Sequence, residues 1–395
     1  MNDAATLAKD DLSEADLVPY LDSGTLEWRR NVDAVLRRHA PAEYIHRADE
    51  EKRFPEEAIR AMAEAGWFAV TLPEQHGGVG SYMEMAALLE MLGRHSIGLA
   101  RHWNITCNMV GGAIAAFAPE LAERLLPQVA EGKLFFAFAL SETEAGSDAA
   151  RLRTAGEVQG DEAVITGSKT WITGALQADY ILTACRTDRS GGKHDGISLF
   201  LVPRDAPGLT IRPIELLGGH AIRTCELHFD AVRVPMANRV GELHRGWRQL
   251  MGVLAKERVA LAAICVGAAQ AACDQAADYA RVREQFGRPV GSFQAIAHKL
   301  ADMQTRIDGA RLLTYRAARL LADGRPCARE SSQAKVFAAD TYVQVATDGV
   351  QVLGANGYAM ENSMQRHYRE AKLFQIFGGT SEIQRNIIAR SMGLG

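Results

Sequence analysis

The sequence lacks the cysteine and histidine patterns that mark metal and disulfide sites. Its six cysteines are scattered without a CxxC pair, and its 11 histidines include no HExxH. We therefore expect no metal site, and we expect the cysteines to be small buried residues in a reducing compartment. No GxGxxG follows a predicted strand, which excludes a Rossmann-type dinucleotide site.

Long apolar runs and blocks of one charge are also missing. No stretch reaches the roughly 18 apolar residues of a membrane span. Net charge is only -4, from 44 basic and 48 acidic residues, and no basic run stands out. Neither a membrane span nor a nucleic-acid partner is predicted. Residues 1–19 are acidic, with neither a hydrophobic signal core nor an Arg-rich pattern, so we expect a cytoplasmic location.

The overall composition is typical of a globular protein. Along the chain, the predicted secondary structure changes twice, from helices to strands and back to helices. The sequence is 395 residues long, 47% hydrophobic and 23% charged, which allows two or three domains. Helical spacing dominates residues 25–131. Short β-branched or aromatic runs separated by turn signals follow at 162–173, 180–186, 197–202 and 225–229. Long helical patterns return at 253–281, 292–322, 328–353 and 365–377.

This order predicts an α+β multidomain protein. We expect an N-terminal all-α domain, a central small antiparallel β-barrel or sandwich, and a C-terminal four-helix bundle. The expected boundaries are an acidic extension at 1–24, followed by domains at 25–134, 135–238 and 239–395.

Five motifs stand in a recognisable order along the chain. In SETEAGSD, small and hydroxyl-bearing residues let a backbone approach a ligand and donate hydrogen bonds, although alone this stretch is at least as typical of a capped turn. The motifs are LPEQHGG at 72–78, SETEAGSD at 141–148, KTWIT at 169–173, REQFG at 283–287 and GTSE at 379–382. Together they resemble the acyl-CoA dehydrogenase family over nearly the whole chain beyond residue 25.

The resemblance implies FAD as cofactor and assigns residues to it. The tryptophan and threonine of KTWIT lie two apart on a predicted strand and so share a face, where the indole would pack on the flavin ring and the hydroxyl would reach N5. A core tryptophan beside a surface threonine is the alternative reading. By resemblance, the cofactor-binding positions within the subunit are Phe138, Leu140, Ser141, Ser147, Trp171, Ile172, Thr173, Thr380, Ser381 and Glu382.

A second group of cofactor positions implies a partner subunit. A guanidinium suits a pyrophosphate by charge and fork geometry, while a lone arginine is usually only a solvated surface charge. In the family, the arginine of REQFG reaches FAD held by a neighbouring subunit. The matching positions here are Arg283, Phe286, Gln294, Gln351, Gly354 and Ala355. A homo-oligomer, most simply a tetramer built as a dimer of dimers, is therefore expected.

The catalytic base is predicted at an uncommon position. Many family members have glutamate where this chain has Gly378, but the long-chain and isovaleryl types keep their base at the position of Glu257. Apolar neighbours predict burial and a raised pKa for Glu257, whereas pairing with Lys256 or Arg258 on a solvated face is the alternative. By resemblance, the Gly378 N–H and a ribityl hydroxyl hold the thioester carbonyl, and glycine leaves room for a long or branched acyl chain.

Some departures from the family leave the thioester carrier open. Ala255 stands where relatives often have aspartate beside the thioester tail, and Thr143-Glu144 replaces a usual Pro-Gly. The carrier is coenzyme A or the pantetheine arm of a carrier protein. Ser147, Arg258 and Gly379 are the predicted substrate contacts.

The predicted function is FAD-dependent α,β-dehydrogenation of a saturated acyl thioester to its trans-2-enoyl product, in fatty or branched acyl metabolism. Electrons would pass to an electron-transferring flavoprotein, as the resemblance implies. Three alternatives stay open: a flavin monooxygenase of the same fold, a dehydrogenase acting on a carrier-tethered acyl or aminoacyl group, and a non-catalytic binding protein.

Overall fold

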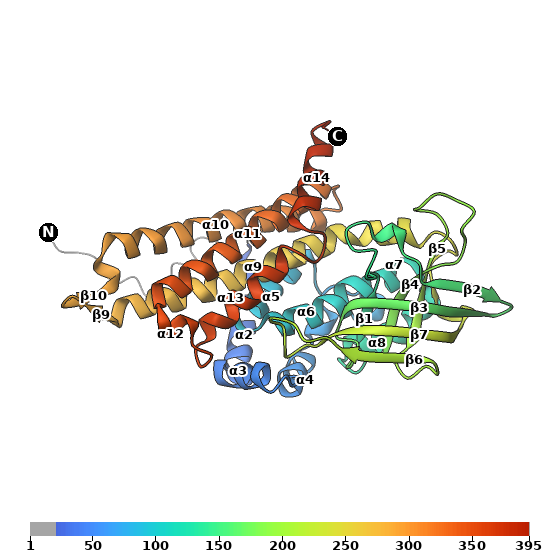
Figure 1. The fold of residues 1–395 in the computed structure, drawn as a ribbon, viewed down its shortest axis with the longest axis horizontal. Coiled ribbons are helices and arrows are strands. Elements are labelled where there is room, and N and C mark those ends of the chain that lie inside the picture. Colours follow the sequence, from blue (N-terminus) through green and yellow to red (C-terminus); the bar gives the residue numbers. More distant parts are fainter. Residues whose placement is uncertain (1–20, 395) are drawn as a thin grey trace.

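The computed structural model describes residues 21–394. The predicted acidic extension therefore lies outside the described residues, except for residues 21–24, and helix α2 already begins at Ser23. The remaining chain forms an elongated molecule with a β-sheet at one end and long helices at the other (Figure 1). Within the described range, no helix is both long and apolar enough to cross a membrane.

The N-terminal region is helical, as predicted. Helix α5 begins with a capping box, in which Ser81 and Glu84 bond each other's backbone N–H groups. A π-helical stretch, η3, joins α6 to α7 without a break. The sequence pattern did not predict this continuous helical segment. The helices are α2 (Ser23–His39), α3 (Ala42–Glu50), α4 (Glu56–Glu64), α5 (Tyr82–His95), α6 (Ile97–Trp103), η3 (Asn104–Gly111), α7 (Gly112–Phe117) and α8 (Pro119–Ala130), with short 3-10 turns at Trp67–Ala69 and Glu74–His76.

The central region is one sheet in the order β6-β7-β3-β2-β4-β5-β8, with β1 beside β4. Most neighbours are antiparallel as predicted, but β1 runs parallel to β4 and β2 meets β4 in parallel, so the sheet is mixed. The strands are β1 (Phe136–Ala139), β2 (Ala155–Gln159), β3 (Glu162–Thr173), β4 (Tyr180–Arg186), β5 (Ile197–Pro203), β6 (Leu209–Pro213), β7 (Thr224–Pro235) and β8 (Arg239–Val240), with 3-10 turns at Ala149–Arg151 and Met236–Asn238.

The C-terminal region is a helical bundle around α9, which runs from the sheet to the opposite end of the molecule (Figure 1). The predicted helix at 365–377 is observed from Ser363 to Phe374, and the loop after it contains Gly378 and Gly379, both with positive φ angles. The elements are α9 (Gly246–Val282), β9 (Glu284–Gln285), β10 (Arg288–Pro289), the 3-10 turn Val290–Ser292, α10 (Gln294–Ala322), α11 (Ala328–Leu353), α12 (Ala355–Tyr358), α13 (Ser363–Phe374) and α14 (Ser381–Ser391).

Buried charges tie the helices together. Glu90 on α5 pairs with Arg29 on α2 at 2.8 Å and with Arg311 on α10 at 3.1 Å. Tyr315 donates to the same carboxylate at 2.7 Å. These partners overcome the effect of burial and lower the pKa of Glu90 to about 2. The network fixes the helical framework, and α9, packed against α5 and α11, carries side chains from this framework toward the sheet.

Candidate functional site

A cavity of about 510 Å³ lies where α6, the sheet, α9 and the start of α14 meet. It brings together residues far apart in sequence. The predicted site residues that line it are Phe138, Leu140, Ser141, Ser147, Trp171, Ile172, Thr173, Glu257, Arg258, Gly378 and Gly379.

Glu257 projects from α9 toward Gly378. Its side chain is buried, at 7% exposure, and an ideal Cβ placed on Gly378 would lie 3.4 Å from Glu257 Oε1. Burial raises the pKa of Glu257 to about 7, against the opposing charges of Arg258 and Lys335. The alternative of a solvated Glu257 is therefore wrong. Lys256 instead lies with its Nζ 5.0 Å from the centre of the Tyr82 ring.

The loop that carries Gly378 is held by side chains that the sequence did not single out. Lys335 Nζ donates to the Gly379 carbonyl at 2.7 Å, and Gln384 Nε2 donates to the carbonyls of Gly378 and Gly379, both at 3.0 Å. Gly378 has φ 63, which favours glycine. Among residues 21–394 the Gly378 N–H has no acceptor. The backbone orientation is thus fixed while this donor stays free.

The helical spacing of the buried residues in α11 could have drawn attention to Lys335. It falls on the buried face of α11, together with Ser331, Ala338 and Tyr342, and a lysine at such a position needs a polar partner. It is 1% exposed, and desolvation lowers its pKa to about 8. Its acceptor, the Gly379 carbonyl, is distant in sequence, so the spacing alone does not reveal it.

Trp171, Ile172 and Thr173 form one wall of the cavity. A register shift between Lys169 and Ile172 interrupts the pairing of β3 with β7, and Trp171 has φ 64. The indole is 57% exposed, so the reading of a core tryptophan is wrong. Trp171 and Thr173 both line the cavity, and they offer a flat apolar surface next to a hydroxyl group.

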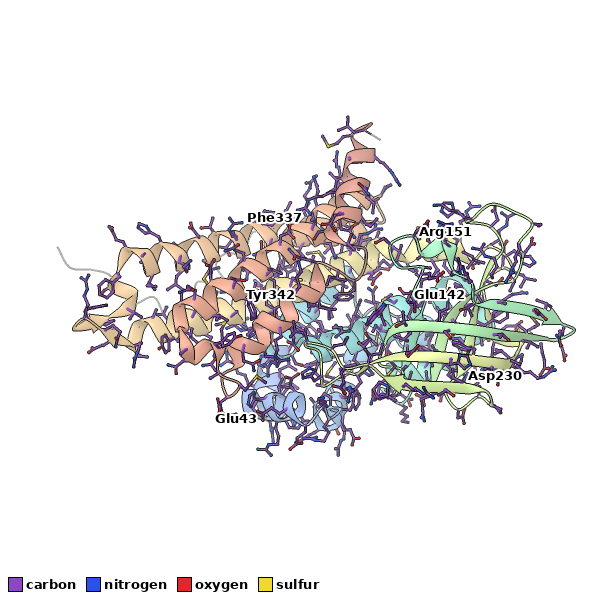
Figure 2. All side chains as sticks on the ribbon, viewed as in Figure 1. Glu43, Glu142, Arg151, Asp230, Phe337 and Tyr342 are labelled. Carbon is purple, nitrogen blue, oxygen red and sulfur yellow. The ribbon has the colours of Figure 1, made fainter. Side chains whose placement is uncertain are left out.

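The loop containing Ser141 and Ser147 is fastened to the sheet by a buried ion pair. Lys169 Nζ on β3 lies 2.8 Å from Glu142 Oε1 and donates to the Leu140 carbonyl at 2.9 Å. Glu142 also accepts from the backbone N–H groups of Arg153 and Thr154, at 2.7 and 2.9 Å. Figure 2 shows Glu142 at the junction of the sheet and the helices. This support holds the serine hydroxyls against the cavity.

The positions predicted to contact FAD in a neighbouring subunit lie at the end of the molecule away from the cavity. Arg283 follows the last residue of α9 and lies 26 residues after Glu257, which places it about 40 Å along the helix axis at ~1.5 Å per residue. Phe286, in the β9–β10 turn, is 94% exposed. None of this group lines the cavity of its own chain; the members are Arg283, Phe286, Gln294, Gln351, Gly354 and Ala355.

Of the GTSE positions, Gly379 lines the cavity, whereas Thr380, Ser381 and Glu382 do not. Thr380 caps α14 by accepting from the Ile383 N–H at 3.3 Å, and Ser381 Oγ bonds Asp340 at 3.2 Å. Glu382 is exposed in the first turn of that helix. In this chain they shape the start of α14, and their predicted contact with the cofactor stays a prediction.

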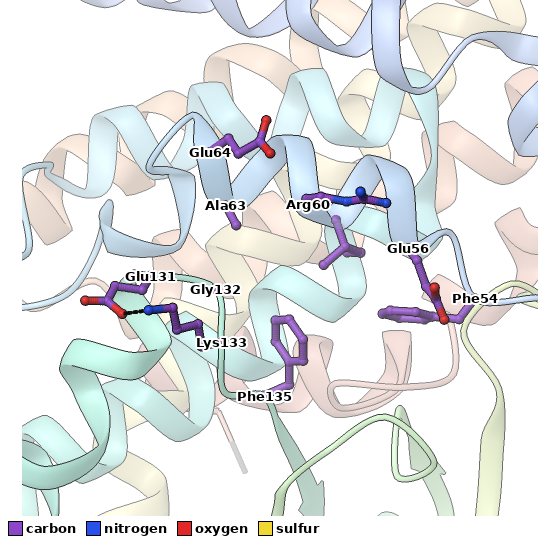
Figure 3. A pocket seen from close by; sticks show the side chains of 10 residues that line it. Phe54, Glu56, Arg60, Ala63, Glu64, Glu131, Gly132, Lys133 and Phe135 are labelled. Atoms are coloured by element: carbon purple, nitrogen blue, oxygen red, sulfur yellow. Dashed lines mark ion pairs between the residues drawn. The ribbon is translucent and has the colours of Figure 1, made fainter.

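A second hollow, of about 430 Å³, lies between α4 and the loop before β1 (Figure 3). It is lined by Phe54, Arg60 and Phe135 among others, and its Lys133 pairs with Glu131 at 2.7 Å. No predicted site residue lies in it. The chemistry-bearing groups therefore gather in the cavity beside Glu257.

The cavity suits a flat aromatic cofactor on observations from this chain. Its lining combines the exposed indole of Trp171, the hydroxyl groups of Ser141, Ser147 and Thr173, and the buried carboxyl group of Glu257. Such a set can stack a ring, bond its polar edge and remove a proton from a neighbouring carbon.

Comparison with known proteins gives matches along almost the entire chain. The N-terminal, middle and C-terminal domains of acyl-CoA dehydrogenases match residues 24–133, 137–232 and 244–393. An acyl-CoA dehydrogenase of Bacillus subtilis is 38% identical over 362 residues, which is 91% of this chain and 94% of that protein.

Solved structures agree with these matches. Glutaryl-coenzyme A dehydrogenase in complex with glutaryl-CoA superposes with a TM-score of 0.91 at 32% identity, covering 95% of this chain and 96% of that one. The prolyl acyl carrier protein oxidase AnaB superposes with a TM-score of 0.90 at 28% identity, covering 95% and 100%. The predicted three-part fold is confirmed by the family matches and these superpositions.

Proposed function

This chain belongs to the acyl-CoA dehydrogenase family of flavin-dependent oxidoreductases, and we propose that it converts a saturated acyl thioester to the trans-2-enoyl thioester with FAD. The observation that carries this proposal is the buried Glu257 carboxyl group facing Gly378 within the cavity. We also propose that residues 25–134, 135–238 and 239–395 form the three domains around the site.

Glu257 is suited to remove the α-proton of the thioester. Burial raises its pKa to about 7, which makes the carboxylate a stronger base than an exposed glutamate while a large fraction stays ionised at neutral pH. The free Gly378 N–H is suited to donate to the thioester carbonyl and to stabilise the charge that develops there. Lys335 and Gln384 keep that N–H in place through the two glycine carbonyls.

Residues of this cavity would hold the cofactor next to the base. Trp171 would stack on the flavin, with Thr173, Ser141 and Ser147 as hydrogen-bonding groups. When bound, FAD supplies the two-electron acceptor for the β-hydrogen. Arg258, Ser147 and Gly379 are proposed to contact the substrate, and an electron-transferring flavoprotein is proposed as the electron acceptor.

The distal arginine leads to a prediction about assembly. Arg283 is too far from its own cavity, so we propose that it contacts FAD in a second copy within a homotetramer. Arg283→Ala is expected to lower retained FAD at least about tenfold, because a charge-assisted bond to a phosphate is lost. Flavin absorbance per protein after gel filtration measures this.

Arg281→Ala is the matched control. Arg281 lies on the same helix end and pairs with Asp278 on its own helix at 2.7 Å, so its loss is expected to leave the flavin content unchanged. Equal flavin content in both variants and the wild type would contradict the assignment of Arg283.

A second candidate is the same reaction on a group tethered to a carrier protein. The superposition with AnaB supports it, as do the departures at Ala255 and Thr143-Glu144. A flavin monooxygenase is disfavoured, because oxygen chemistry at a flavin does not use a buried carboxyl group next to Gly378.

Anaerobic reduction of the purified yellow protein tests the proposal. We expect bleaching of flavin absorbance by at least one member of a panel of acyl-CoAs and acyl-carrier proteins, with a trans-2-enoyl product found by mass spectrometry. A flavin-loaded protein that no thioester reduces would refute the proposed reaction. Oxygen-dependent formation of a hydroxylated product would favour the monooxygenase.

A further inference from the structure

A buried arginine on α6 holds the hydroxyl group of Thr173, one of the side chains that line the cavity. Arg101 is 3% exposed, and its Nη2 donates to Thr173 Oγ1 at 2.6 Å. Thr224 Oγ1 lies 3.2 Å from the same atom. A guanidinium only donates, whereas a hydroxyl group has two lone pairs and one proton. The bond from Arg101 therefore leaves Thr173 with its proton to give to Thr224 or to a group inside the cavity.

Two further contacts keep the guanidinium of Arg101 in this position. Its Cζ lies 5.5 Å from the centre of the Phe377 ring, within the range of a cation–π contact. On another side, its Nη1 lies 2.7 Å from the place that a Cβ would take on Gly219, a glycine with φ 77. The glycine therefore leaves the space that the guanidinium fills.

An arginine at this place does little for the stability of the fold. Its Nε and Nη1 have no hydrogen-bond partner within residues 21–394. Burial lowers the pKa of Arg101 to about 10, so the side chain stays positive at neutral pH. Glu370 on α13 is the carboxylate whose charge acts on it, but burial raises the pKa of Glu370 to about 7, so this neighbour is only partly ionised there. A buried charge with unmet donors is unfavourable, and such groups are expected mainly at functional sites.

The proposed reaction creates a negative charge next to Thr173. One proton leaves the α-carbon of the thioester for Glu257, and a hydride, which is a proton with two electrons, leaves the β-carbon for the flavin ring. A neutral oxidised ring that accepts a hydride becomes an anion. A positive charge and a hydrogen-bond donor beside the ring stabilise this reduced form more than the oxidised form.

We propose that Arg101 is a positioning residue that directs the Thr173 hydroxyl group toward the flavin as a donor and, with its own charge, raises the reduction potential of the bound flavin. Thr224 would donate to the second lone pair of Thr173, which leaves the Thr173 proton for the flavin. This inference rests on the proposed function for the place of the flavin beside Thr173. The atom that acts is Nη2, so the role needs no contact between Arg101 and the substrate.

The test is the midpoint potential of the bound flavin, measured without a thioester by equilibration with a reference dye during slow chemical reduction. Arg101→Met is expected to lower the equilibrium constant for two-electron reduction about 10- to 100-fold, the range of one charge-assisted contact, which is about 30–60 mV. An apolar side chain of similar length leaves no unmet donor at this site, so the variant is expected to fold. Arg101→Lys keeps a charged donor and is expected to retain most of the wild-type potential.

Gly219→Ala is a second test that leaves both side chains unchanged. The new Cβ would displace the guanidinium of Arg101 from Thr173, so the potential is expected to fall as it does in Arg101→Met. Gly160→Ala is its matched control, because Gly160 has φ 66 and no atom within 4 Å of an added Cβ. Arg366→Met is the control for the loss of a buried arginine, since Arg366 does not line the cavity. Both controls are expected to keep the wild-type potential.

The outcomes that overturn the proposal are distinct. An unchanged potential in Arg101→Met would overturn it, and so would an unchanged potential in Gly219→Ala if the first variant does not fold. An equal fall in Arg101→Lys and Arg101→Met would exclude the charge as the cause. An equal fall in Arg366→Met would show that any buried arginine has this effect and would remove the special role of Arg101.

Failure of this inference and failure of the proposed reaction give different results, because the potential is measured without a thioester. A lowered potential in Arg101→Met, in a protein whose flavin no thioester bleaches, would refute the reaction and leave the role of Arg101 standing. Bleaching by a thioester, with equal potentials in the wild type and Arg101→Met, would leave the reaction standing and overturn the role of Arg101. A protein that binds no flavin would overturn both.

Discussion

Replacing Glu257 by glutamine is expected to slow flavin reduction by a good acyl thioester about 10²- to 10⁴-fold, the usual range for loss of a positioned base. Glutamine keeps the shape of the side chain but cannot accept the α-proton. FAD is expected to stay bound, because the residues proposed to hold it are unchanged. Anaerobic stopped-flow spectroscopy measures the rate, and near-normal reduction would refute Glu257 as the base.

The pH dependence provides a second test of the same residue. Burial raises the pKa of Glu257 to about 7, so flavin reduction is expected to rise with pH through about 7 and to level off above it, as the carboxylate forms. The folded state favours the neutral acid, so ionisation of Glu257 reduces stability as pH rises above the value for an unfolded glutamate. Glu257→Gln should therefore unfold at an equal or higher temperature than the wild type at pH 8, which separates lost catalysis from lost folding.

Moving the base to the commoner position is expected to fail unless space is made for it. In Glu257→Gly with Gly378→Glu, the new Cβ at position 378 would clash with Leu261 Cδ1. The backbone there also has φ 63, which costs a non-glycine residue about 1–2 kcal/mol. We expect the double variant to reduce flavin no faster than Glu257→Gly alone.

Shortening Leu261 to alanine in that double variant is expected to restore a measurable rate, with a changed preference for acyl chain length. Leu261→Ala alone is the control. It should retain the base, while core truncation lowers its free energy of unfolding by about 2–5 kcal/mol. A folded, FAD-loaded triple variant without activity would contradict the idea that both positions reach the same space. Activity in the double variant would show that the loop moves to accept the new side chain.

Regular elements were predicted well where the spacing of apolar residues was clear. The strands at 162–173 and 180–186 and the helix at 328–353 have the predicted bounds, because β-branched runs bounded by turn residues and a 3.6-residue period in a helix are local properties. The π-helical stretch Asn104–Gly111 and the parallel pairing of β1 with β4 were missed. Neither has a local pattern: the first continues an apolar helix, and the second joins residues 44 apart.

Some residues of the candidate site could also be predicted from the sequence, and others could not. Glu257 was predicted as a buried base, and Trp171 and Thr173 as flavin contacts, from the resemblance to the family, because the residues alone are equally compatible with a solvated glutamate and a core tryptophan. Arg101 could not be predicted, since an arginine in a sequence is usually exposed. Only the fold shows that the side chain is buried beside Phe377 and that two of its nitrogens have no acceptor within residues 21–394.

The sequence by itself determined the order of helical and β regions, the motifs and the presence of a carboxyl group in an apolar stretch of α9, because all of these depend on neighbours in the chain. Tertiary structure alone decided that Glu257 faces Gly378, that Lys335 and Gln384 hold the glycine loop, and that Arg283 lies far from its own cavity. Those facts depend on the direction and length of helices packed against one another, and such distances are fixed only when the chain has folded.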